Sequence, residues 1–235
     1  MKIVMVTGTD TGVGKTVATA ALAARWQHEG LRVGVYKAVQ TGIPATGSGP
    51  EPADVSEVNR LAGEDVVVKE GIRLPLPLAP VPAARDAGVA LPPLSEHVAT
   101  IRALASNVDL VLVEGSGGLL VELTAAGQTL AELCTAVDGG LVLVARPDLG
   151  TLNHTLLTLE AARARGLQLT GLLLGSWPED PEILHATNEE YLRHRCATTS
   201  TPWLGRIPEQ AGSWSGARFR AGALRWLSPV AADAS

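Results

Sequence analysis

The sequence predicts an α/β protein: a doubly wound, mostly parallel sheet flanked by helices in a single domain. Three observations support this fold class. Short apolar runs recur along the chain without period-two alternation, as in strands that are covered on both faces. Helical patterns lie between these runs, and that order produces parallel strands joined by right-handed crossovers. With 235 residues, 46% of them hydrophobic, the chain can bury one sizeable core.

The individual elements follow from these patterns in order. Strands are predicted at residues 3–6, 33–36, 110–113, 141–145 and 172–174, and a last short strand and turn at 203–209. Helices are predicted at residues 16–28, 54–61, 95–106, 129–137, 152–165 and 181–193. Ser95 is a favourable N-cap, Gly166 a favourable C-cap, and Pro181 is expected in the first turn of its helix. In such sheets ligands bind at the carboxyl ends of the strands, so candidate site residues are expected there.

Residues 71–93 and the C-terminal tail stand apart from this pattern. Prolines at 75, 77, 80, 82, 92 and 93 predict one long irregular loop over 71–93. Such a loop either covers a bound substrate or is a solvated connector, and both interpretations stay open. The predicted domain therefore spans residues 1–228, with a frayed tail at 229–235.

Composition argues against several functions. A net charge of −5 and a charged fraction of 18% argue against binding of nucleic acid. No stretch approaches the ~20 apolar residues of a membrane span, and the first residues do not form a signal peptide. Cys134 and Cys196 lie far apart in helical contexts, which favours buried thiols over a disulfide. We expect a cytoplasmic protein.

The most specific motif is VTGTDTGVGKT at residues 6–16, which links a strand to a helix. Its glycines allow backbone N–H groups to cradle phosphate oxygens at a helix N-terminus. Lys15 can reach the β- and γ-phosphates, and the Thr16 hydroxyl can ligate Mg²⁺. The usual first glycine of the motif is Thr9 here, with Gly8 one residue earlier. The motif predicts a P-loop fold that binds a nucleoside triphosphate through Thr11, Gly12, Val13, Gly14, Lys15, Thr16 and Val17.

Charged residues at the ends of two other strands extend this site. Lys37 follows the second predicted strand, where a second cation can neutralise charge on a transferring phosphoryl group. The other interpretation of Lys37 is an exposed lysine in a surface ion pair. Glu114 ends a strand like that of a Walker B motif and is the best carboxylate ligand for Mg²⁺. Asp54 is a second candidate ligand, although helix N-termini favour aspartate for other reasons.

Weaker signals follow the remaining strands. The segments expected at the base end of the nucleotide contain Gly175, Ser176, Ile207, Pro208 and Glu209. The helix that begins near Thr151 offers free N–H groups, and Asn153 a side-chain amide, to an anionic group. His154 is interpreted as a packed or capping histidine and is not assigned to the site.

Together these segments resemble the dethiobiotin synthetase family, and the match extends to nearly the whole chain. The segments that carry the resemblance are GTDTGVGKT at 8–16, KAVQTG at 37–42, EGSGG at 114–118, LGTLNH at 149–154 and GRIP at 205–208. The phosphate-binding loop with its shifted glycine is this family's form of the motif.

The resemblance implies a reaction in which 7,8-diaminopelargonic acid, CO₂ and MgATP give dethiobiotin, ADP and phosphate. An amine takes up CO₂ to form a carbamate, which attacks the γ-phosphate to give a carbamic-phosphoric anhydride; the second amine then closes the ureido ring. Cations must separate the carbamate from the triphosphate. The implied catalytic residues are Lys37 and Lys15. Thr41 would hold the diamine or carbamate, Thr16, Asp54 and Glu114 the metal, and Gly115, Ser116 and Gly117 the nucleotide.

The resemblance also implies a homodimer with the substrate at the interface. Thr151, Leu152 and Asn153 would then bind the substrate carboxylate from the partner subunit, and Tyr191 matches a substrate-facing tyrosine loosely. One position departs from the family. Family members place an adenine-reading asparagine where this chain has Gly175, so we expect a nucleotide preference looser than strict ATP, with CTP or GTP accepted.

Three alternatives share this nucleotide-binding pattern. Nucleotide-switch ATPases of the ParA and MinD type carry an additional lysine early in the loop, where this chain has Asp10. Amidotransferase-type cobyrinate synthases need a glutaminase domain for which 235 residues leave no room. A relative that kept the fold without the activity is disfavoured by the presence of Lys15, Thr16, Lys37 and Glu114.

Overall fold

The computed structural model describes residues 2–43 and 52–228, and these residues form seven strands and eight α-helices. The strands are β1 (Lys2–Gly8), β2 (Val33–Thr41), β3 (Val67–Leu74), β4 (Leu110–Gly118), β5 (Gly140–Ala145), β6 (Gln168–Trp177) and β7 (Trp203–Pro208). The helices are α1 (Lys15–His28), α2 (Asp54–Ala62), α3 (Pro80–Ala87), α4 (Leu94–Ala105), α5 (Leu130–Ala136), α6 (Thr151–Ala164), α7 (Ile183–Thr198) and α8 (Gly216–Trp226), with a 3₁₀ turn at Glu209–Ser213.

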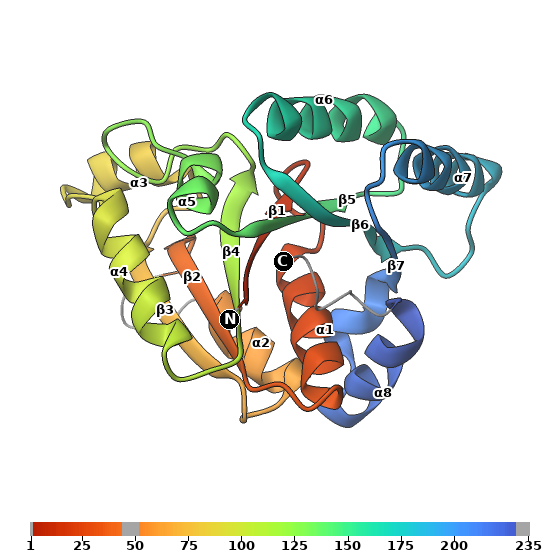
Figure 1. Cartoon of the computed structure of the whole chain (residues 1–235), viewed down its shortest axis with the longest axis horizontal. Coiled ribbons are helices and arrows are strands. Elements are labelled where there is room, and N and C mark those ends of the chain that lie inside the picture. Colours follow the sequence, from red (N-terminus) through yellow and green to blue (C-terminus); the bar gives the residue numbers. More distant parts are fainter. Residues whose placement is uncertain (1, 44–51, 229–235) are drawn as a thin grey trace.

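The strands form one sheet in the order β3-β2-β4-β1-β5-β6-β7. Every pair of neighbouring strands in this order is parallel. The chain begins near the middle of the sheet, extends to β3 on one edge and to β7 on the other, and crosses back between them (Figure 1). The predicted doubly wound α/β fold is therefore confirmed, and the sheet is wholly parallel.

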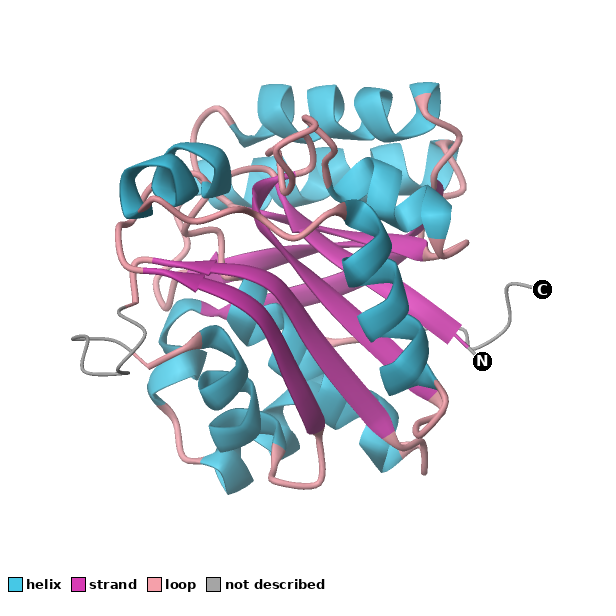
Figure 2. Cartoon of the chain, turned by 90° about the vertical axis from the view of Figure 1, so that its left-hand side faces the viewer, coloured by secondary structure: helices cyan, strands magenta, loops and turns pink. Residues whose placement is uncertain are grey.

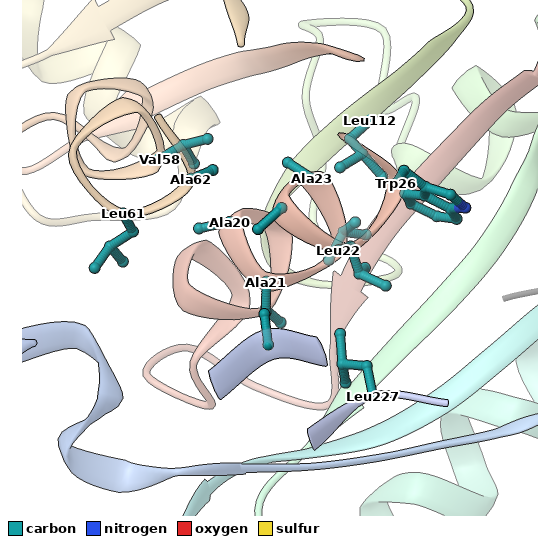
Figure 3. Close-up of a cluster of buried hydrophobic side chains, with 14 of the residues drawn as sticks. Ala20, Ala21, Leu22, Ala23, Trp26, Val58, Leu61, Ala62, Leu112 and Leu227 are labelled. Carbon is teal, nitrogen blue, oxygen red and sulfur yellow. The ribbon is translucent and has the colours of Figure 1, made fainter. Parts of the chain in front are cut away.

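Helices cover both faces of the sheet, as the view from the side shows (Figure 2). On one face, α1, α2 and α8 pack against β1, β2 and β4 around Leu22, Trp26, Leu61 and Leu112 (Figure 3). On the other face, side chains from α3, α4, α5 and α6 enclose a second apolar cluster. Because both faces are buried, the central strands need no polar alternation, which is why their sequences appear as unbroken apolar runs.

The prediction of an irregular loop over residues 71–93 is wrong, because this stretch contains the end of β3 and all of α3. β3 is an edge strand that mixes charged residues (Lys69, Glu70 and Arg73) with apolar ones, and all of its residues except Leu74 are at least partly exposed. Pro80 and Pro82 lie in the first turn of α3, where backbone N–H groups have no partner within the helix, so proline costs little there.

The other differences concern helix ends and the C-terminal region. Helix α4 begins at Leu94 with Pro93 as its N-cap residue, so Ser95 is not the cap. Helix α7 begins at Ile183 after a capping box formed by Glu182 and His185, so Pro181 lies outside it. Helix α8 was not predicted. The expected tail at 229–235 lies outside the described residues. None of the helices in the described ranges is long and apolar enough to span a membrane.

Candidate nucleotide and substrate site

The segment between β1 and α1 is curled around its glycines. Gly12 and Gly14 have φ values of 75° and 92°, a region that favours glycine, and Gly14 is the N-cap residue of α1. A Cβ atom at Gly8 would lie 2.7 Å from the carbonyl oxygen of Asp10 and 3.1 Å from Lys15 Nζ. The shifted glycine therefore has a structural reason: the loop folds back over position 8, which leaves no room for a side chain.

Lys15 lies inside this loop and is 8% exposed. Its Nζ atom donates a hydrogen bond to the carbonyl oxygen of Asp10 at 2.9 Å. Burial and the nearby charge of Lys37 lower the pKa of Lys15 to about 8. A bound phosphate would stabilise the charged form of this lysine.

Lys37, Asp54 and Glu114 form a compact charged cluster. The register between β2 and β4 places Lys37 directly beside Glu114. Lys37 Nζ lies 2.6 Å from Asp54 Oδ2 and 2.8 Å from Glu114 Oε1, and it donates a further bond to the carbonyl oxygen of Gly115 at 3.1 Å. Thr16 Oγ1 donates to the same Glu114 Oε1 atom at 2.9 Å. Strands β2 and β4 and the starts of α1 and α2 thus converge on a single set of groups.

Burial and the mutual interaction of the charges together set the protonation of this cluster. Burial on its own would lower the pKa of Lys37, but Glu114 and Asp54 outweigh it and hold that pKa above its ordinary value. Burial raises the pKa of Glu114 despite the adjacent ammonium group. Asp54 is less buried, and Lys37 overcomes the effect of burial and lowers its pKa. Of the two carboxyl groups, Glu114 therefore takes up a proton first.

Two polar side chains support the cluster: Gln40, which was not predicted, and Ser116, which was. Gln40 accepts a hydrogen bond from the Asp54 backbone N–H at 3.0 Å and donates to the carbonyl oxygen of Thr41 at 3.1 Å. Gln40 thereby holds the start of α2 against the end of β2. The sequence holds one indication that Gln40 belongs to the site: it lies inside the 37–42 segment, three residues after Lys37. Ser116 Oγ likewise donates to the carbonyl oxygen of Val39 at 2.7 Å, tying β4 to β2.

One cavity of about 550 Å³ joins these groups. The predicted residues that line it are Thr11, Gly12, Gly14, Lys15, Thr16, Val17, Lys37, Thr41, Asp54, Glu114, Ser116 and Gly117. Pro77, Leu78, Ala79 and Pro80 close one side, so the proline-rich segment contributes to the wall of the site. Val39, Gln40 and Val121 complete the lining and were not predicted.

Three other predicted residues, Val13, Gly175 and Ser176, lie in or against the phosphate-binding loop but do not line the cavity. Val13 is buried in the core. Gly175 packs against the loop so closely that a Cβ atom there would lie 2.1 Å from the Val13 carbonyl oxygen. Ser176, which has a φ of 54°, lies beside Gly14. The glycine at 175 therefore has a packing reason that the sequence does not reveal.

The last strand and the α6 helix are separate from the cavity lining. Ile207 is buried in the core, Pro208 is half-buried, and Glu209 is exposed at the start of the 3₁₀ turn.

At the start of α6, the Thr151 side chain is buried against Thr155, Leu152 is partly buried against an apolar cluster, and Asn153 is exposed. Tyr191 is 41% exposed on α7. Within the described part of one chain, none of these residues is among those that line the cavity.

The oxygen atoms of the cluster suit a hard divalent cation. Thr16 supplies a hydroxyl, Asp54 a carboxylate, and Glu114 an Oε2 atom that is buried without a hydrogen-bond partner in the described structure. An unpaired buried carboxylate oxygen is costly unless a cation or donor meets it. No cluster of three or more His, Cys, Asp or Glu side chains occurs among the described residues, so phosphate and water would have to complete an octahedral shell.

A phosphate-binding loop at the carboxyl edge of a parallel sheet, with Lys37 and Glu114 on adjacent strands and Asp54 at the start of α2, defines a P-loop protein that binds nucleoside triphosphates. A family model described as an AAA domain matches residues 2–213. The ATP-dependent dethiobiotin synthetase of Rhodococcus jostii is 47% identical over 227 residues, covering 97% of this chain and 95% of that protein. The corresponding synthetase of Streptomyces coelicolor is also 47% identical, covering 97% and 93%. The chain belongs to the dethiobiotin synthetase family.

Among solved structures, the septum site-determining protein MinD from Pyrococcus horikoshii, in complex with Mg-ADP, aligns with a TM-score of 0.57. That alignment covers 96% of this chain and 92% of MinD at 16% sequence identity. At this level the likeness shows the shared fold alone.

Proposed function

We propose that this chain is an ATP-dependent dethiobiotin synthetase that carboxylates 7,8-diaminopelargonic acid and closes its ureido ring. The observation that carries the proposal is that two lysines, Lys15 and Lys37, line one cavity. The same cavity is lined by Thr16, Asp54 and Glu114, whose oxygen atoms can bind a metal ion. A carbamate and a triphosphate repel each other, and cations between them are what the reaction requires. The family relationship supports the same activity.

In this proposal each residue has a role that its position supports. Lys15 binds the β- and γ-phosphates, and Lys37 stabilises the negative charge that develops between the carbamate and the γ-phosphoryl group. To do so, Lys37 exchanges contacts with Asp54 and Glu114 for contacts with the reacting oxygens. Thr41 lines the same cavity and donates a hydrogen bond to the diamine or carbamate. Thr16, Asp54 and Glu114 would hold Mg²⁺, which when bound neutralises phosphate charge.

A direct assay tests the activity. The purified chain is incubated with 7,8-diaminopelargonic acid, MgATP and carbon-13 bicarbonate, and the product is analysed by mass spectrometry. We expect dethiobiotin that carries the labelled carbon, with one ADP formed per product because the anhydride intermediate consumes one γ-phosphoryl group. Hydrolysis of ATP without a labelled cyclic urea would contradict the proposal.

The nucleotide preference is expected to be loose. The space that a side chain at Gly175 would need is taken by the Val13 carbonyl oxygen, so only backbone and neighbouring side chains can meet the base there. A bidentate amide contact of the kind used to read bases is worth about 1–3 kcal/mol. Turnover with ATP, GTP, CTP and UTP at equal concentrations should therefore differ by less than about tenfold in kcat/KM. A preference for ATP above about a hundredfold would contradict this expectation.

We also propose that the active unit is a homodimer in which α6 of one subunit approaches the substrate of the other. The exposed side chain of Asn153 and the exposed Leu149 and Leu157, which are 84% and 56% accessible, support a contact at this end of α6. The free N–H groups at the start of α6 would then bind the substrate carboxylate. The cytoplasmic location remains a prediction from sequence.

A further inference from the structure

Arg146 connects the strand next to β1 with the phosphate-binding loop. It follows β5 directly, and its guanidinium donates to Asp10 Oδ2. The other carboxylate oxygen of Asp10 accepts a hydrogen bond from the Thr11 backbone N–H at 2.7 Å. The carbonyl oxygen of the same residue accepts the bond from Lys15 Nζ. Asp10 is thus held at three points, and Arg146 provides the only ion pair that the described residues make with its carboxylate.

The negative charge of Asp10 opposes the binding of an anion by this loop. The loop is built to receive an anion, yet Asp10 places a carboxylate between the glycines that form the cradle. The Thr11 N–H, together with Arg146, holds the pKa of Asp10 below its ordinary value, so the carboxylate stays ionised at neutral pH. Without a compensating cation, this carboxylate would repel a bound triphosphate.

Stabilisation of the fold does not account for Arg146. The pair is substantially exposed, with side-chain accessibilities of 32% for Arg146 and 53% for Asp10, and exposed ion pairs contribute little to stability. In addition, Arg146 Nε is buried without a hydrogen-bond partner in the described structure, which is unfavourable for folding. The arrangement is better explained by what it does for a ligand.

We propose that Arg146 is a positioning residue for nucleotide binding, which acts by neutralising the Asp10 carboxylate of the phosphate-binding loop. The inference rests on the nucleotide-binding part of the proposed function. It does not depend on which acceptor receives the phosphoryl group. Arg146 acts through Asp10 and has no assigned contact with the reacting atoms.

The test measures the dissociation constant of MgADP by calorimetry for the wild type, Arg146→Ala, Arg146→Lys and the double variant Asp10→Asn, Arg146→Ala. Loss of the arginine alone should weaken binding about tenfold, because the Asp10 carboxylate is then uncompensated. Removing the carboxylate as well should restore binding to within about threefold of the wild type. Arg146→Lys keeps the positive charge and should also remain within about threefold.

Arg32→Ala is the matched control, because Arg32 forms a comparable Arg–Asp pair with Asp109, which precedes β4 at the opposite end of the sheet. It should leave MgADP binding unchanged. Thermal unfolding of every variant separates binding from folding. The inference is overturned if Arg146→Ala binds like the wild type, or if the double variant binds as weakly as Arg146→Ala. Failure of the dethiobiotin assay with this binding pattern intact would instead count against the proposed function alone.

Discussion

Replacing Lys37 with alanine should reduce dethiobiotin formation by at least about 10²–10³-fold, the loss typical when one preorganised charge at a reacting centre is removed. Lys37 is 4% exposed and meets both carboxylates of the cluster, so its ammonium group is held in a fixed position within the cavity. The decrease should fall on kcat more than on the KM for MgATP, because Lys15 and the loop still bind the nucleotide. Steady-state kinetics with product detection by mass spectrometry measures both.

The same substitution should also destabilise the protein in the absence of Mg²⁺. Breaking a buried ion pair leaves an uncompensated charge and costs about 3 kcal/mol or more in the free energy of unfolding. Without the ammonium group, burial raises the pKa of Glu114 further, so the folded state binds more protons than the unfolded state. The stability of the variant should therefore fall as the pH rises from about 5 towards neutrality. Denaturant unfolding at several pH values measures this slope.

Lys69→Ala is the matched control for Lys37→Ala, since Lys69 is an exposed lysine on the neighbouring strand β3. It should change neither turnover nor stability beyond about 0.5 kcal/mol. If Lys37→Ala retained more than a tenth of the turnover, the proposed role of Lys37 would be wrong. Lost turnover accompanied by unfolding even in saturating MgADP would indicate a structural role instead.

Replacing Glu114 with glutamine should have the second largest effect. The substitution keeps an acceptor for Lys37 and Thr16 but removes the negative charge proposed to bind Mg²⁺. We expect the Mg²⁺ concentration for half-maximal activity to rise at least about tenfold, together with a large loss of turnover. Titration of Mg²⁺ in the product assay gives this value.

Stability should not fall with activity in the Glu114 variant. Burial raises the pKa of Glu114, so its ionised form costs free energy in the folded state as the pH rises. A neutral glutamine removes that cost, and the variant should be as stable as the wild type at neutral pH. Glu64→Gln, at an exposed glutamate, is the matched control and should leave the Mg²⁺ dependence unchanged. Unaltered Mg²⁺ dependence in Glu114→Gln would contradict its proposed role as a ligand.

Features encoded in contiguous residues could be predicted from the sequence. The phosphate-binding loop is local, because its glycines, Lys15 and Thr16 lie within nine residues between a strand and a helix. The buried central strands appear as apolar runs because both faces of the sheet are covered. The rule that ligands bind at the carboxyl ends of such strands then identified Lys37 and Glu114, and both line the cavity.

The edge strand β3, helix α3 and helix α8 were missed because their local sequences lack these patterns. The edge strand β3 is held beside β2 by backbone hydrogen bonds, and composition does not reveal this pairing. The first turn of α3 tolerates prolines that usually indicate a loop. Pairing with β2 therefore decides the structure of β3, whereas the prolines of α3 fit the first turn of the helix itself.

The sequence by itself therefore determined the fold class, the phosphate-binding loop and the residues at the strand ends. Only the tertiary structure decided which charges neutralise one another: Lys37 with Asp54 and Glu114, and Arg146 with Asp10. It also showed that Gly175 is needed where β6 meets the loop. The physical reason is that these contacts join residues far apart in the chain, so they depend on strand order and register, whereas backbone conformation and apolar periodicity are set by neighbours in sequence.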